Sequence, residues 1–89
     1  MQDVNLTNCQ IRAARGALGW SVKMLAELSG VGSATIVRYE DSMGVPVSRK
    51  DNLARIKTVF EAAGIEFIGT PDDAPGIRIH RPKSPQNSV

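Results

Sequence analysis

The feature that most limits how this chain can fold is a short turn centred on Gly30, between two stretches of helical periodicity. Ala26 lies four residues earlier, where two helices would cross most closely and a larger side chain would push them apart. Gly30 can adopt the positive φ that a sharp turn requires. Val31 and Ile36 then point back toward Leu25 and fix the angle between the helices. Two helices joined by so short a turn predict a helix-turn-helix.

Cap and stop residues divide the chain up to Gly64 into four short helices. Thr7 and Gln10 have the spacing of a capping box, and Ser21 and Ser48 are placed to cap the second and fourth helices. Apolar residues recur at three- and four-residue intervals within the helical segments. We therefore expect helices over about Asn8 to Leu18, Val22 to Ser29 and Ser33 to Asp41. A fourth helix should begin at the cap candidate Ser48-Arg49-Lys50-Asp51, with the acid in its first turn, and run to Ala63.

After Gly64 the pattern changes to an alternation typical of β-strands. Ile65 to Ile68 and Ile77 to His80 alternate approximately, and the stretch between them, Gly69 to Gly76, is rich in turn residues. We expect a β-hairpin whose loop is long for this motif. In one interpretation its apolar side chains cover the helical core; these are Ile65, Phe67, Ile77 and Ile79. In the other, the hairpin also pairs with its twin in a dimer, because exposed edge strands invite pairing.

The length of 89 residues is enough for one small domain. We expect a helical domain over residues 1–64, the hairpin over 65–81 and a disordered tail over 82–89. The formal net charge of +2 permits nucleic-acid binding but does not demand it. No apolar run approaches the roughly 18 residues of a membrane span, and the N-terminus lacks the regions of a signal peptide. A single cysteine fits a reducing compartment, so a cytoplasmic location is expected.

Residues that could carry catalysis or bind a metal are few. Cys9 is expected to be a passive, partly buried cysteine rather than a redox sensor, although it stands in the first turn of a helix, where a thiol can be acidified. His80 is alone in a strand and has no partner ligands, so we expect no metal and no cofactor. The sequence contains no phosphate-binding glycine loop and no nucleophile–base pair, which makes an enzyme a poor hypothesis.

Five segments together resemble the phage repressor and Cro family, also called the XRE family. They are Leu18-Gly19-Trp20-Ser21, Leu25-Ala26, Gly30-Val31, Ala34-Thr35-Ile36 and Arg38-Tyr39-Glu40. The resemblance covers about Gln10 to Gly64. It implies a mainly α, lambda-repressor-like four-helix DNA-binding domain, here with a C-terminal β-hairpin. It also implies that the third helix enters the DNA major groove, that dimers read two half-sites, and that Arg15 and Glu40 form a structural ion pair.

Side-chain directions on the third helix select the residues that could read bases. Ile36 and Tyr39 face inward, so the outward residues are expected to be Ser33, Ala34, Val37 and Arg38. Arg38 can donate two hydrogen bonds to a guanine edge, worth roughly 1–3 kcal/mol of discrimination. Ala34 or Val37 could touch a thymine methyl group. The family's base contacts correspond to Ser33, Ala34 and Arg38.

Contacts to phosphates should supply most of the affinity and its salt dependence. Backbone amides at helix starts are expected to contribute, together with the side chains of Ser21, Lys23, Thr35, Arg49 and Lys50. Two positions depart from the family. Val22 replaces a residue that is often polar, and Gly32 replaces a serine or threonine at the cap of the third helix. Val22 remains at the expected interface, but direct readout looks thin and shape readout gains weight.

Two functions are therefore carried forward. The first is a sequence-specific transcriptional regulator of double-stranded DNA, acting as a homodimer through its C-terminal part. Repression is favoured, and activation through a contact with RNA polymerase is compatible with the same fold. The second is a protein-interaction module, such as an antitoxin or an antiactivator, built on the same scaffold. Val22, Val37 and the low net charge lend support to the second.

Overall fold

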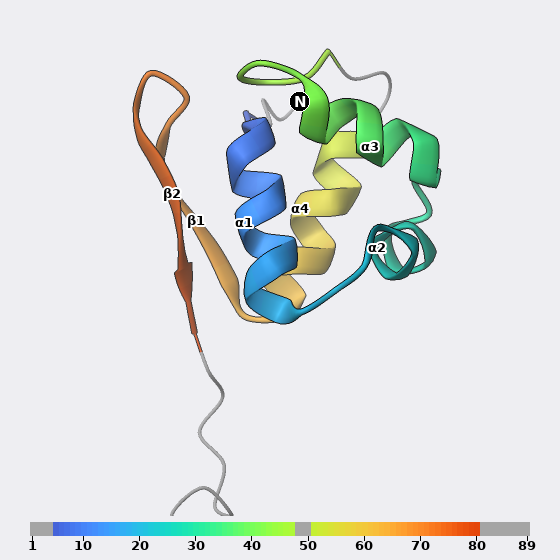
Figure 1. Ribbon diagram of the computed structural model, residues 1–89. Helices are drawn as coiled ribbons and strands as arrows, with labels where there is room; N and C mark the ends of the chain where they lie inside the picture. The colour runs from blue at the N-terminus through green and yellow to red at the C-terminus, as the bar shows by residue number, and fades with distance from the viewer. Residues whose placement is uncertain (1–4, 48–50, 81–89) are drawn as a thin grey trace, which may run out of the picture.

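The computed structural model describes residues 5–47 and 51–80, in which four helices are followed by a β-hairpin (Figure 1). The elements are α1 (Asn8–Leu18), α2 (Val22–Ser29), α3 (Ser33–Asp41), α4 (Asn52–Ala62), β1 (Ile65–Thr70) and β2 (Asp73–Ile79). The predicted bounds of the first three helices are confirmed, as is the mainly α fold class with its C-terminal hairpin. Within the described ranges, no helix has the length and apolar character needed to cross a membrane.

The ends of α1 and α2 form as their cap residues predict. The Thr7 hydroxyl accepts from the Gln10 amide at 3.1 Å, and the Thr7 amide donates to Gln10 Oε1 at 3.0 Å, which completes the capping box. Ser21 Oγ accepts from the Met24 amide at 3.0 Å. Gly19 ends α1 in the left-handed conformation, with φ of 69°. These contacts pair some of the backbone groups that helix ends leave without an intrahelical partner.

The fourth helix begins later than predicted. Its cap candidate Ser48 lies outside the described residues, and Asp51, expected in the first turn, is at the N-cap position of α4, which begins at Asn52. The Asp51 carboxylate makes no capping hydrogen bond and instead pairs with Arg55 one turn later, at 3.3 Å. The helix also ends one residue earlier than predicted, because Ala63 serves as its C-cap.

The core lies between the helices and one face of the hairpin. Its buried hydrophobic residues are Leu6, Ile11, Ala14, Leu25, Val31, Ile36, Tyr39, Leu53, Ile56, Phe60 and Ile65. Phe60 of α4 stacks on Trp20 with ring centroids 5.6 Å apart and meets Phe67 of β1 edge-on at 6.0 Å. Ile65, Phe67 and Ile77 cover the core as predicted, whereas Ile79 is 46% exposed and does not.

The hairpin loop is shorter than the sequence indicated. The strands continue past Ile68 and are joined by two residues, Pro71 and Asp72. A bulge interrupts the register between Ile68 and Thr70, where Gly69 adopts φ of 77°. A Cβ at Gly69 would overlap the Ala74 carbonyl, so the strands can approach here because this residue has no side chain. The residues from Gly69 to Gly76 are typical of a loop, yet most of them belong to the two paired strands.

Candidate nucleic-acid interface

The turn between α2 and α3 is closed by both backbone and side-chain hydrogen bonds. Gly30 has φ of 76°, and its amide donates to the Ala26 carbonyl at 2.9 Å. Ser29 Oγ donates to the Leu25 carbonyl at 2.7 Å and accepts from the Val31 amide at 3.2 Å. Ser29 was not identified from the sequence, where the available signal was a serine directly before the turn glycine. These contacts hold α3 at a fixed angle to α2.

One face of α3 is buried and the other is exposed. Ile36, Tyr39 and Glu40 are almost fully buried. The exposed side chains are Ser33, Ala34, Val37 and Arg38, as predicted, and Thr35 is intermediate. In Figure 1, α2 and α3 lie on the side of the bundle away from the hairpin. The face of α3 that would meet another molecule is therefore not covered by the rest of the described chain.

The N-terminus of α2 presents backbone donors beside two different side chains. Lys23 is exposed and Ser21 is exposed, so both can reach a molecule lying along this helix end. Val22 is partly buried and packs against the hydrophobic core. Its apolar character is thus explained by packing, and the amides of this first helical turn have no intrahelical acceptor. The N-terminus of α3 is similar, since its N-cap Gly32 offers no side-chain acceptor.

Two groups of contacts hold the C-terminal end of α3 on α1. Arg15 Nε and Nη2 each donate to a carboxylate oxygen of Glu40 at 2.8 Å, and Arg15 Nη1 donates to the Trp20 carbonyl at 3.1 Å. The expected structural ion pair is confirmed, with Glu40 buried. The hydrogen bond to Glu40 raises the pKa of the Arg15 guanidinium above its ordinary value, while burial opposes the shift.

Asn8 makes the second group of contacts and was not singled out from the sequence. The Asn8 side-chain Oδ1 accepts from the Gly44 backbone amide at 3.2 Å, and its Nδ2 donates to the Glu40 carbonyl at 3.4 Å. The Asn8 backbone amide donates to the Gly44 carbonyl at 2.9 Å. The loop after α3 is therefore fastened to the first turn of α1. In the sequence, the only sign of this contact is an asparagine at the first position of a helix. Its partner Gly44 could not be identified, because it lies 36 residues away.

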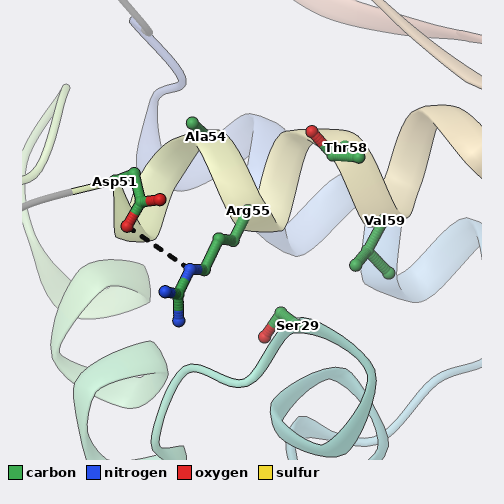
Figure 2. A pocket seen from close by; sticks show the side chains of 6 residues that line it. All are labelled: Ser29, Asp51, Ala54, Arg55, Thr58 and Val59. Carbon is green, nitrogen blue, oxygen red and sulfur yellow. Dashed lines mark ion pairs between the residues drawn. The ribbon is translucent and has the colours of Figure 1, made fainter.

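The start of α4 faces the end of α2 across a shallow hollow of about 400 Å³ (Figure 2). Figure 2 shows Arg55 reaching from α4 toward the turn after α2 while paired with Asp51. Lys57 pairs in the same way with Glu61, at 3.8 Å. Both pairs have the i,i+4 spacing of ion pairs on an exposed helix surface. Arg49 and Lys50, the two expected phosphate contacts before α4, lie outside the described residues.

The remaining candidate residues lie away from α3. Cys9 is exposed, which corrects the expectation of a partly buried thiol: the buried side of α1 is formed by Gln10, Ile11 and Ala14. Whether it has a redox role stays a prediction. His80 Nε2 lies 2.7 Å from Glu66 Oε1 on the hairpin. Within residues 5–47 and 51–80, no group of three or more potential ligands could hold a metal ion.

Comparison with known proteins agrees with this geometry. Residues 11–42 match the protein-family model described as Helix-turn-helix. The matched segment contains most of α1 and all of α2 and α3, together with the turn at Gly30. It ends before α4 and the hairpin begin. No curated protein matches the chain.

Proposed function

Residues 11–42 form a helix-turn-helix domain of the XRE/Cro-like type, and from this premise we propose that the protein is a sequence-specific transcriptional regulator. It acts as a dimer on palindromic operators, with α3 of each copy in the major groove. The observation that carries the proposal is the division of α3 into two faces. Ile36 and Tyr39 are buried, while Ala34, Val37 and Arg38 remain exposed on an uncovered surface.

Base readout in this proposal rests on the exposed face of α3. Arg38 has an exposed side chain whose guanidinium carbon lies 5.9 Å from the Tyr39 ring centroid, which leaves its donors available to a guanine edge. Val37 is 47% exposed and suits an apolar contact with a thymine methyl group, as does Ala34. Ser33 adds one hydroxyl. So small a set of donors gives weight to recognition of DNA shape.

Phosphate contacts in this proposal come mainly from helix N-termini. At α2 the Met24 amide is capped by Ser21, and at α3 no side chain caps the first turn. The other first-turn amides of both helices have no helical carbonyl to bind, and the helix dipole there favours an anion. Lys23 and Ser21 stand beside one of these ends and Thr35 beside the other. Arg49 and Lys50, which precede α4 in the sequence, complete the proposed set. Such contacts supply sequence-independent, salt-sensitive affinity.

The second copy is proposed to bind through the hairpin. A two-stranded sheet has strand edges that no third strand covers, and Ile79, which would otherwise be expected in the core, is 46% exposed at the end of β2. The hairpin also lies away from α3, so pairing there leaves both recognition helices free. Because Ile65 is part of the core, the test uses the full chain. Ile79→Asp should dissociate the dimer in light scattering after size exclusion, and a dimer that persists unchanged would contradict this interface.

The sign of regulation follows from where the operator lies. A dimer of this size that covers a promoter represses by occupying it, and we favour that outcome. An operator beside the promoter would allow an exposed surface of the domain to contact RNA polymerase and activate. A reporter assay with the selected operator placed at each position distinguishes repression from activation.

The proposal is tested by paired substitutions in a gel shift with operators selected from random DNA. Arg38→Ala should weaken operator binding by roughly 10- to 100-fold and relax the preference at one base position. Lys50→Ala should weaken all sequences alike and reduce the salt slope by about one. Arg78→Ala, a matched change on the hairpin, should leave base preference unaltered. Normal operator binding by Arg38→Ala would show that α3 does not dock as proposed.

A second candidate function is a protein-interaction module, and one observation favours it. Met24 and Leu28 are 41% and 50% exposed and stand one turn apart on α2. Together with Val37 on α3, they give this side of the domain exposed apolar side chains. Val22 no longer supports this reading, because it packs on the core. Failure to bind any selected DNA at low salt, with tight binding to the product of a neighbouring gene, would favour the second candidate.

A further inference from the structure

Gln10 joins the first helix to both strands of the hairpin. Its side chain is 4% exposed, and its Nε2 donates to the Ile68 carbonyl at 3.1 Å and to the Gly76 carbonyl at 2.9 Å. Ile68 and Gly76 are register partners across the sheet. Gln10 Oε1 also accepts from the Thr7 amide in the capping box. Both side-chain donors of this amide are thus used on the hairpin, and the acceptor is used on the helix cap.

The same helix is also bonded to α3 and to the loop that follows it, through Arg15 in its last turn and Asn8 in its first turn. Arg15 holds Glu40 through two hydrogen bonds of 2.8 Å, and Asn8 holds the loop that follows α3. In Figure 1, α1 stands between the hairpin and helices α2 and α3. Directional polar contacts therefore run from β1 and β2 through α1 to α3.

Apolar packing alone leaves the hairpin's angle loosely defined. Phe67 and Ile77 are only partly buried against the core, and apolar contact has no preferred direction. A two-stranded hairpin is marginal in stability by itself, so its placement depends on what it rests on. Hydrogen bonds weaken steeply when they are misaligned. Two such bonds from one buried amide restrict both sliding and rotation of the hairpin against α1.

We propose that Gln10 is a positioning residue for operator recognition: it sets the angle between hairpin and α3, and thereby the spacing of half-sites that the dimer accepts. This inference rests on the proposed hairpin-mediated dimer. Each added base pair moves one half-site by about 3.4 Å and by roughly a tenth of a turn. A rigid connection between hairpin and α3 therefore selects one spacing, and a loosened connection accepts several.

The experiment compares Gln10→Glu with Thr7→Ala on operators whose half-sites are moved closer or farther by one and two base pairs. Gln10→Glu keeps an acceptor for the Thr7 amide but places an oxygen opposite two carbonyls, so it releases the hairpin while sparing the cap. Thr7→Ala weakens the cap and spares the hairpin contacts. Binding is measured at mildly alkaline pH, so that the introduced carboxylate is ionised, with light scattering to report the dimer.

For the unaltered protein we expect a loss of about 100-fold when the spacing is changed, because the second half-site is no longer engaged. In Gln10→Glu, the loss of affinity on changing the spacing should fall to about tenfold or less, while the preferred half-site sequence stays the same. Thr7→Ala should keep the narrow optimum. If Gln10→Glu is dimeric and keeps the original narrow spacing optimum, the role of Gln10 is overturned while the proposed dimer stands. An equal broadening in Thr7→Ala would also overturn it, since the effect would then be one of general stability.

Further measurements keep the test decisive if Gln10→Glu does not fold, or if the proposed hairpin-mediated dimer is itself wrong. Gln10→Met keeps length and apolar burial without either donor, and it should broaden the optimum as Gln10→Glu does. In the unaltered protein, the Gln10 side-chain amide protons should exchange slowly in the DNA complex, and rapid exchange would overturn the inference without any variant. An unaltered protein that is monomeric, or that binds all spacings equally, would overturn the proposed dimer together with this inference.

Discussion

The helical region and the hairpin are held in place by different means. Helices α1 and α2 begin and end at residues that cap them from within a few positions, such as Thr7, Ser21 and Gly19. The hairpin instead depends on distant residues, since Gln10 lies 58 and 66 positions from the carbonyls that it binds. Helix boundaries are thus encoded locally, whereas the placement of β1 and β2 depends on their contacts with α1 and α4.

The anchors on α1 also differ in charge. The contact to α3 is a partly buried ion pair between Arg15 and Glu40, and the contact to the hairpin is a neutral amide on two carbonyls. Removing half of a buried ion pair leaves an unpaired charge, which costs more than losing a neutral hydrogen bond. The helical region should therefore show the largest response to a single substitution.

Glu40→Ala is expected to have the largest effect. It leaves the Arg15 guanidinium without its carboxylate in a site where Arg15 itself is only 25% exposed. We expect a loss of about 3 kcal/mol in the free energy of unfolding, measured by urea denaturation. The double variant Arg15→Met with Glu40→Leu serves as the control and should lose less than Glu40→Ala alone. A single variant as stable as the unaltered protein would show that the pair is not desolvated.

Much of the helical region could be predicted from the sequence because its signals are short-range. The capping box at Thr7 and Gln10, the cap at Ser21 and the turn at Gly30 predicted approximate bounds for three helices that the structure confirms. Helical periodicity also placed Ile36 inward and Arg38 outward on α3. What these signals could not give was the start of α4, where Asp51 pairs with Arg55 instead of capping the helix.

The hairpin could be predicted in existence but not in detail. Its alternation was visible, yet the Gly69 bulge allows the strands to extend into residues that resemble a loop. Gln10 was recognised as part of a helix cap. Nothing in the neighbouring sequence shows that its side-chain nitrogen donates to carbonyls of the hairpin, 58 and 66 residues away. The exposure of Cys9 was missed for a related reason: burial on α1 depends on where the hairpin rests.

Gly69→Ala should destabilise the hairpin by an intermediate amount. The residue has φ of 77°, and an added Cβ would overlap the Ala74 carbonyl. We expect a loss of about 2 kcal/mol in the free energy of unfolding, from strain in a conformation that alanine rarely adopts. Gly76→Ala is the matched control, because its new Cβ would meet Ile68 at an ordinary 3.7 Å. If Gly69→Ala and Gly76→Ala are equally stable, the positive φ at Gly69 is not needed for pairing of the two strands.

The smallest effect is expected on the solvent side of the hairpin, at Glu66. The hydrogen bond from His80 lowers the pKa of the Glu66 carboxyl, and the charge of Arg78 adds to the shift. A lowered pKa in the folded state means that the contribution to stability is present above the unfolded pKa and is lost as the pH falls through the folded one. The melting temperature should therefore fall slightly faster in the acid range than it does for Glu66→Gln.

Two variants separate the causes of this acid dependence. Because the His80 hydrogen bond is the larger cause, His80→Ala should remove more of the difference from Glu66→Gln than Arg78→Ala does. The reverse order would assign the shift to the charge of Arg78. The effect stays small because Glu66 is solvent-exposed and screened by water and salt. A large acid response here would instead place Glu66 in a dry environment, such as the interface with a second copy.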